Sequence, residues 1–137
     1  MSRILALDIG QRRIGVAVSD ALNMTAQGVG VIDRKTTKNV VEGIKDLIKQ
    51  YDIGKIIVGM PFNMNGSRGS GAENIDIFLS LLRKDISLEI ITVDERLTTA
   101  QGERVLIEAD ISRKKRKGLI DKIAAQLILQ TYLDSNV

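Results

Sequence analysis

Three acidic residues occupy positions where strands should end or a helix should begin. Asp8 closes one apolar strand, Glu95 follows another, and Asp121 lies in the first turn of an apolar helix. The chain contains no His and no Cys, which excludes Ser-His and Cys-His nucleophile pairs and thiolate zinc sites. The chemistry that remains is that of carboxylates holding a hard metal ion, as in phosphodiester hydrolysis or phosphoryl transfer.

Each of these acids also has an ordinary explanation. Asp8 could be a solvated residue beside a hairpin, Glu95 could belong to a charged strand exit, and Asp121 could stabilise the helix dipole. Together they are more specific, because two-metal hydrolysis needs several carboxylates around ions roughly 4 Å apart and no His base. Adjacent residues of an extended chain point in opposite directions, so only one of Asp94 and Glu95 should face the site, and Glu95 is favoured. Magnesium is the expected ion, with manganese as a common substitute.

Basic and polar residues near these acids are candidates for binding phosphate groups. Gly10 and Gly15 should leave space for a ligand, and a glycine-rich loop at 59–71 is long enough to suggest a function. The basic run 113–117 should form a rim with salt-dependent, largely sequence-independent affinity for nucleic acid. A flexible connector and a solvated charged face are the plainer explanations. The candidate substrate-binding residues are Arg12, Arg13, Asn63, Ser67, Arg68, Arg96, Arg113, Lys114, Lys115, Arg116 and Lys117.

Composition limits the class of protein. The 137 residues should form one domain, 1–137, whose core is aliphatic, since hydrophobic residues make up 44% and aromatic residues only 3%. The net charge of +3 is a weak hint of a polyanionic partner, and so few aromatics favour a structured or duplex nucleic acid over a single-strand stacking platform. No apolar run approaches the roughly 20 residues of a membrane span, and no signal peptide is recognisable. We expect a soluble cytoplasmic protein.

The first elements that must position the acids are three strands. Apolar runs at 3–8 and 14–19, joined by a short turn, predict a hairpin. A third strand at 28–33 follows a short connection and should also be antiparallel.

Helical spacing then alternates with strands. A helix at 40–51 should stop near Gly54, and a strand at 55–60 ends at Pro61. A second helix is predicted around residues 75–82, a third from Thr98 to about Glu108 with a capping box, and a last one from Leu119 to about Leu133. The continuous apolar run at 88–93 is typical of an interior parallel strand. The prediction is an α/β fold with a mixed five-stranded sheet, three antiparallel strands and then two parallel ones, flanked by helices.

With these residues in place, the chain resembles the YqgF (RuvX) family over essentially its whole length. That resemblance implies a ribonuclease H-like fold related to RuvC resolvase, with Asp8, Glu95 and Asp121 as the acidic triad of a metal-dependent nuclease. The implied role is maturation of the 5′ end of pre-16S ribosomal RNA, and Holliday junction resolution is the older proposal. Family members often carry Asp where this chain has Asn65. The matching blocks are Leu7–Gly10 with Arg13–Asp20, Val58–Pro61 with Asn63–Met64 and Gly66–Ser67, Val93–Thr99, and Ser112–Lys117 with Asp121–Leu129.

Several functions remain open at this point. The main hypothesis is an endonuclease on structured RNA, such as a pre-ribosomal particle. A resolvase acting on branched DNA as a homodimer is a close alternative, and a non-catalytic nucleic-acid-binding factor is a third. The Asp8-to-Gly15 segment also resembles the phosphate loop of actin-like ATPases and sugar kinases, but those proteins need a second lobe that 137 residues cannot supply. The sequence does not choose between RNA and DNA or between a monomer and a homodimer.

Overall fold

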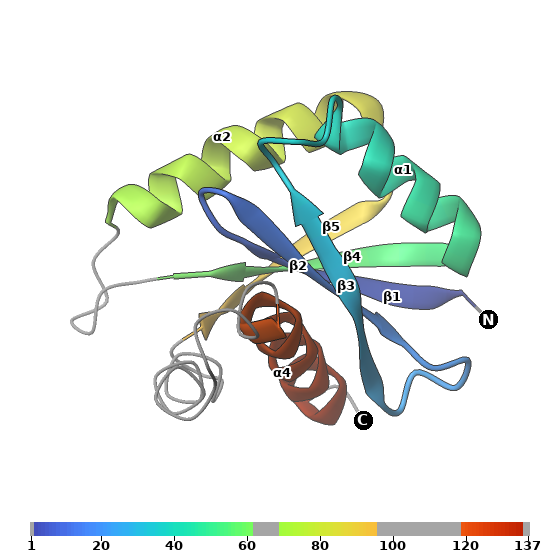
Figure 1. The fold of residues 1–137 in the computed structure, drawn as a ribbon. Coiled ribbons are helices and arrows are strands. Elements are labelled where there is room, and N and C mark those ends of the chain that lie inside the picture. Colours follow the sequence, from blue (N-terminus) through green and yellow to red (C-terminus); the bar gives the residue numbers. More distant parts are fainter. Residues whose placement is uncertain (1, 62–68, 96–118, 136–137) are drawn as a thin grey trace.

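The computed structural model describes residues 2–61, 69–95 and 119–135. No helix in these ranges is long and apolar enough to cross a bilayer. The elements follow in the order β1 (Arg3–Ile9), β2 (Arg13–Ser19), β3 (Ala26–Asp33), α1 (Val40–Tyr51), β4 (Ile53–Met60), α2 (Ser70–Asp85), β5 (Glu89–Asp94) and α4 (Leu119–Ser135) (Figure 1).

The strands form one mixed sheet in the order β3-β2-β1-β4-β5. β1, β2 and β3 pair in antiparallel fashion, whereas β4 runs parallel to β1 and β5 runs parallel to β4. The predicted α/β fold, with three antiparallel strands followed by two parallel ones, is therefore confirmed. β1, β4 and β5 run parallel to one another, so their carboxyl ends lie at the same end of the sheet.

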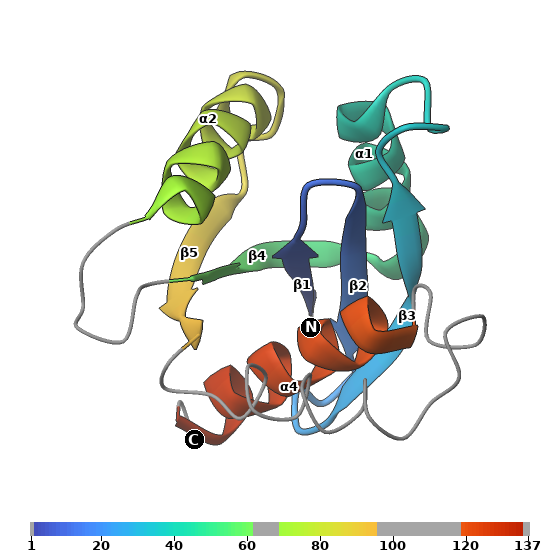
Figure 2. The same ribbon diagram turned by 60° about the vertical axis from the view of Figure 1, so that its left-hand side comes forward.

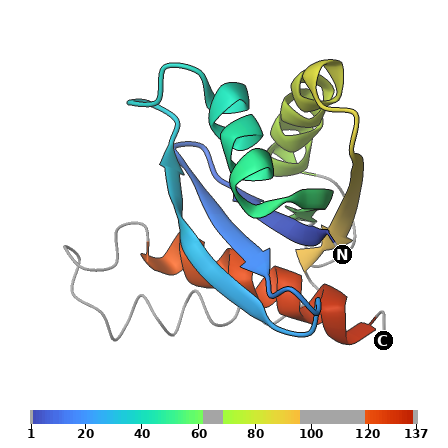
Figure 3. The same cartoon turned by 90° about the vertical axis from the view of Figure 1, so that its right-hand side faces the viewer.

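Helices cover both faces of the sheet. α1 and α2 lie together on one face, and among the described helices α4 lies across the other (Figures 2 and 3). Alternation along β1 divides its side chains between the two layers. Leu5 and Leu7 belong to the cluster under α1 and α2, while Ile4 and Ala6 belong to the cluster under α4. A slip of one residue in register would exchange these two sets.

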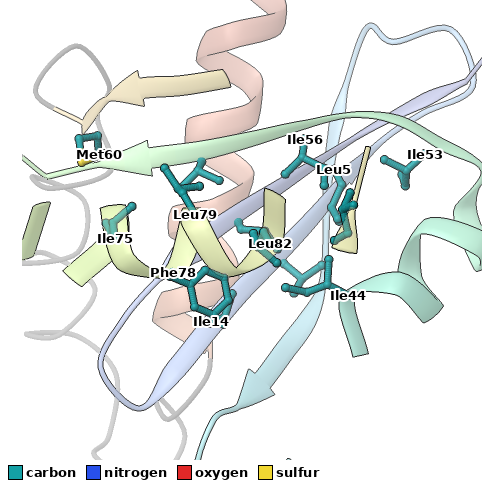
Figure 4. Packing of buried hydrophobic residues seen from close by; sticks show 14 of the residues in the cluster. Leu5, Ile14, Ile44, Ile53, Ile56, Met60, Ile75, Phe78, Leu79 and Leu82 are labelled. Atoms are coloured by element: carbon teal, nitrogen blue, oxygen red, sulfur yellow. The ribbon is translucent and has the colours of Figure 1, made fainter. Parts of the chain in front are cut away.

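The face under α1 and α2 is filled by large side chains. Leu82 of α2 and Ile44 of α1 are completely buried, and they interdigitate with Ile14 and Ile56 from the strands (Figure 4). α1 begins where the Asn39 side chain accepts a hydrogen bond from the backbone N–H of Glu42 at 3.2 Å, which satisfies one of the free donors of the first turn.

The face under α4 is built differently, because alanine supplies five of the ten buried residues of its cluster, against one in the cluster under α1 and α2. Ala6 and Ala17 of the sheet meet Ala124 and Ala125 of α4, and all four are buried. Short side chains on both partners let the helix approach the sheet closely. The approach of α4 to the sheet is closest at Gly15 of β2, where a Cβ would overlap the carbonyl oxygen of Asp121 in the first turn of α4.

Two local predictions were wrong. The strand predicted at 88–93 is β5, and it lies at the edge of the sheet with exposed or half-buried residues, because none of the later residues that the structure describes pairs with it. α1 does not stop at Gly54: Asp52 is its left-handed C-cap, with φ of 54°, a conformation that Asp tolerates better than most residues. Gly54 lies inside β4, where a Cβ would overlap the Ser2 side chain. The helix predicted at 98–108 lies outside the described residues.

Candidate active site

Asp8 lies one residue before the end of β1, the central strand of the sheet, and is only 4% exposed. It pairs across the antiparallel ladder with Gly15. Ile4 and Ala6 contact the α4 layer, so alternation directs the Asp8 carboxylate to that same side. An ionised carboxylate buried this deeply requires polar or charged partners.

Glu95 directly follows β5 and is 5% exposed. Its side chain lies over Gly59 of β4, where an added Cβ would stand 2.8 Å from Glu95 Oε1 and 2.6 Å from Cδ1 of Ile128. Gly59 therefore leaves the space that the carboxylate and α4 fill. Val93 packs against the α4 cluster, so its neighbour Asp94 points to the opposite side of the sheet.

Asp121 is the third residue of α4, and its side chain is 20% exposed. Its Oδ2 accepts a hydrogen bond from Nε of Arg13, the first residue of β2, at 3.1 Å. The backbone of the same turn packs on Gly15. Gly15 was predicted to leave space for a ligand, but α4 occupies that space, and a side chain on Gly10 would meet the carbonyl oxygen of Arg13 across the tight turn.

The structure places the three predicted acids on the α4 side of the sheet, towards the edge where β1, β4 and β5 end. Within residues 2–61, 69–95 and 119–135, no three acidic side chains are gathered closely enough to hold one metal ion. The chemistry of the donors nevertheless fits magnesium or manganese, because Asp8, Glu95 and Asp121 offer only carboxylate oxygens. The donor atoms are therefore of the right kind, but the described acids do not lie close enough together to form a metal site. One of them, Asp121, is hydrogen-bonded to Arg13 instead.

The two arginines predicted to contact phosphate both have acidic neighbours. Arg13 pairs with Asp121, whereas Arg12 is 54% exposed and lies 3.9 Å from Asp33. The pKa of Asp33 is below its usual value, chiefly because the backbone N–H of Lys35 donates to its Oδ1 at 2.9 Å, with Arg12 adding to the effect. The remaining predicted substrate-binding residues, with Asn65, lie outside the described residues: Asn63, Ser67, Arg68, Arg96, Arg113, Lys114, Lys115, Arg116 and Lys117.

A cavity of about 390 Å³ opens beside the β1–β2 turn, between that turn and α2. Arg34 lines it, donating from Nη1 to the carbonyl oxygen of Gly10 at 2.7 Å, and its Cζ atom lies 5.2 Å from the centre of the Phe78 ring. None of the three predicted acids lines this cavity. It is therefore separate from the carboxylates, and its walls include Ile9, Gln11, Pro61, Asn74 and Leu81.

Sequence reasoning missed the role of Gly59. The signal was present, since Gly59 is the one residue without a side chain in the buried segment 56–60. It could not be interpreted without knowing that Glu95 and α4 both cross this point. The Arg13–Asp121 contact was missed for a similar reason, because it joins residues 108 positions apart.

A protein family and several related proteins match this chain in sequence over nearly its whole length. The RuvX family, described as Holliday junction resolvase, matches residues 2–135. A protein of Halothermothrix orenii is 58% identical over 132 residues, which cover 96% of this chain and 94% of the relative. A protein of Natranaerobius thermophilus is 53% identical over 135 residues, covering 98% and 96%. Both are named "Putative pre-16S rRNA nuclease".

Solved structures with low identity share the fold. RuvC of T. thermophilus, in complex with a Holliday junction substrate, superposes with a TM-score of 0.60 at 10% identity, covering 99% of this chain and 96% of RuvC. The Holliday junction resolvase of fowlpox virus gives 0.56 at 18% identity, covering 98% and 99%.

The order and directions of the strands define a ribonuclease H-like fold, which the chain shares with these resolvases. The family match and the close relatives then decide the family, because both extend over almost the entire chain. The chain belongs to the RuvX family. Fold and family together support a nuclease, a hydrolase that acts on phosphodiester bonds.

Proposed function

We propose that this chain is a metal-dependent endonuclease of structured RNA that matures the 5′ end of pre-16S ribosomal RNA in the cytoplasm. The observation that carries the proposal is the pair of buried acids, Asp8 and Glu95, on the same side of the sheet as Asp121. The relatives named for pre-16S rRNA support the choice of substrate.

Burial of these acids is hard to explain by stability alone. Moving an ionised carboxylate out of water costs several kcal/mol unless other charges or hydrogen bonds offset it. Asp8 and Glu95 do interact with other groups of the protein, and the apolar cluster on the same side of the sheet consists mainly of alanine and larger aliphatic side chains. A cation bound at these acids would add to that compensation, which favours a catalytic function for them.

In this proposal Asp8, Glu95 and Asp121 hold magnesium or manganese. Such an ion, when bound, supplies Lewis-acid activation of water and neutralises charge that develops on the phosphate. Asp8 contributes a carboxylate fixed by the central strand, and Gly59 admits the Glu95 carboxylate to the same layer. The exposed Arg12 guanidinium at the β1–β2 turn would bind a flanking phosphate, together with the basic run 113–117.

Resolution of branched DNA is the second candidate. The family description and the fold shared with two Holliday junction resolvases favour it. Two symmetric cuts across a junction require two sites, so this function needs a homodimer, whereas RNA maturation is compatible with a monomer. Substrate and oligomeric state can therefore be tested together.

The experiment is a cleavage assay on a labelled pre-16S 5′ leader and a four-way DNA junction, each with magnesium or manganese. We expect the RNA to be cut, and Asp8→Asn to lower the rate by more than about 100-fold, since losing even the outer partners of metal ligands costs about 10–100-fold. Asp46→Asn is the matched control, because Asp46 is an exposed acid of α1 on the other face of the sheet.

Each outcome assigns a function. Cutting of the RNA alone, lost in Asp8→Asn and kept in Asp46→Asn, supports maturation. Paired, symmetric cutting of the junction by a dimer makes the protein a resolvase. Binding of nucleic acid without metal-dependent cutting of either substrate overturns the nuclease and favours the non-catalytic binding factor.

A further inference from the structure

The first turn of α4 is joined to β2 by an ion pair between Arg13 and Asp121. Arg13 Nε donates to Asp121 Oδ2 at 3.1 Å, and the two side chains are 31% and 20% exposed. This contact is shorter than the 3.9 Å between Arg12 and Asp33 and less exposed to solvent. Partial burial reduces screening by water and salt, so this pair is the stronger of the two.

The backbone holds both partners of this pair in place. The N–H of Gly10 donates to the carbonyl oxygen of Arg13 at 2.9 Å and closes the β1–β2 turn. Two residues further along β2, Gly15 packs directly on the backbone of Asp121. Alternation places Arg13 and Gly15 on the same side of the sheet, which is also the side of Asp8. The guanidinium therefore contacts one predicted metal ligand, Asp121, and lies on the same side of the sheet as a second, Asp8.

A guanidinium in this position conflicts with a divalent cation. Arg remains protonated at all physiological pH values and cannot serve as a metal ligand. Its positive charge repels a metal ion, and it already occupies one of the two oxygens of the Asp121 carboxylate. The two cations therefore compete, and by thermodynamic reciprocity each lowers the affinity of Asp121 for the other.

We propose that Arg13 is a built-in counter-ion that pairs with Asp121 in the metal-free protein and is displaced from it when a divalent cation binds. This inference rests on the proposed function, because it takes Asp121 as a metal ligand. Arg13 acts through Asp121, so it is a positioning residue.

The test measures manganese binding to the whole chain without nucleic acid, by calorimetric titration of the wild type and of Arg13→Gln. Removing the competing guanidinium should tighten manganese binding by at least about fivefold, the lower end of typical coupling between two ligands. In EDTA the same variant should melt at a lower temperature than the wild type, because Asp121 has lost its partner. A saturating concentration of manganese should raise its melting temperature more than that of the wild type.

Matched variants separate this effect from a general disturbance. Arg12→Gln removes the neighbouring, more exposed arginine and should change the manganese affinity by less than about twofold, since exposed charges interact weakly. In an Asp121→Asn background, Arg13→Gln should have no effect on manganese affinity, as a double-mutant cycle requires. Arg13→Lys keeps the charge, should fold like the wild type, and should bind manganese less tightly than Arg13→Gln.

The outcomes distinguish this inference from the proposed function. Manganese binding that is unchanged or weaker in Arg13→Gln, while the wild type binds manganese, overturns the counter-ion role and leaves the metal site standing. If Arg13→Gln tightens manganese binding as much in the Asp121→Asn background as in the wild type, the counter-ion role is also overturned, because the effect does not act through Asp121. An absence of manganese binding to both the wild type and Arg13→Gln overturns the counter-ion role together with the proposed metal site.

Discussion

The two faces of the sheet are formed by the same strands but are lined by different kinds of side chain. Under α1 and α2, large side chains such as Leu82, Ile44 and Phe78 fill the layer. Under α4, small residues such as Ala17 and Ala125 line the contact, and two acids are buried near its end. Alternation along each strand keeps the two sets apart, since every second residue faces the other layer.

The difference indicates that one face mainly stabilises the fold and the other mainly positions the candidate site. Hydrophobic stabilisation grows with the apolar area removed from water, so the large-residue face should supply most of the folding free energy. The small-residue face buries less area per residue, but it brings a helix close enough to set Asp121 on β2, next to the strand that carries Asp8. Changes on the first face should affect stability alone, and changes on the second should affect cleavage more than stability.

The largest change in stability should come from Leu82→Ala on α2. Leu82 is fully buried, and loss of a buried leucine side chain costs about 2–5 kcal/mol. Cleavage per folded molecule should remain at the wild-type level. Urea denaturation gives the free energy of unfolding, and Leu81→Ala is the control, because Leu81 is 48% exposed and should change stability by less than about 0.5 kcal/mol. An equal loss in both variants would contradict the assignment of the core to this face.

Gly15→Ala should destabilise the fold less than Leu82→Ala does, but it should lower the cleavage rate more. The new methyl group would overlap the backbone of Asp121, so α4 must move away from β2. Overpacking of this kind costs about 1–3 kcal/mol. The displacement should also lower cleavage by the folded protein, because it moves Asp121.

Gly30→Ala is the matched control for Gly15→Ala. Gly30 lies on the adjacent strand β3, where a Cβ would meet nothing within 4 Å. Its stability and its cleavage rate should stay close to those of the wild type. If the two alanine variants behave alike, the close approach of α4 does not position the site.

A smaller effect of opposite sign is expected from Gly43→Ala in α1. A Cβ at this helical position meets nothing within 4 Å, and alanine is preferred over glycine inside a helix by about 0.5–1 kcal/mol. Denaturation should show a rise of that size in the free energy of unfolding, with unchanged cleavage. A loss of activity in this variant would show that the α1 face is not independent of the site.

The smallest effect should appear at low pH, in the turn between β2 and β3. The backbone N–H groups of Met24 and Thr25 donate to Asp20 Oδ1 at 2.7 and 3.1 Å, and they lower the pKa of Asp20 below its ordinary value of 3.8. A lowered pKa stabilises the fold above 3.8, and this contribution is lost as the pH falls through the pKa of the folded protein. Asp20→Asn should therefore flatten the fall of stability below about pH 4 in acid titrations followed by circular dichroism. Identical acid profiles would contradict this contribution.

Most of the fold followed from local patterns. The hairpin, the helical spacing at 40–51 and the buried strand before Pro61 each depend on a few neighbouring residues, and the structure has them all. The place of β5 at the edge could not be predicted from its apolar run, because an edge position depends on which strands pair across the whole sheet. Local pattern also misjudged the end of α1, where Asp52 adopts the left-handed conformation expected of Gly54.

The candidate site shows the same limit more sharply. Residue type and strand ends named Asp8, Glu95 and Asp121 as candidates, and their catalytic role stays a prediction. The pairing of Arg13 with Asp121 could not be predicted from the sequence, because it depends on how closely α4 packs against β2. A guanidinium after a turn suits a phosphate and a carboxylate equally well, and only the packing of Gly15 on α4 distinguishes them.

The packing of α4 on β2 also decides when the site can exist during synthesis. The ribosome makes Asp8 and Gly15 within the first strands, whereas Asp121 follows only after more than one hundred further residues. Chains grow at about 5–20 residues per second, so the early hairpin waits for seconds without the helix that covers its small-residue face. A nascent chain therefore carries an incomplete set of acids, and the assembled one arises only after residue 121 has been added and α4 has docked.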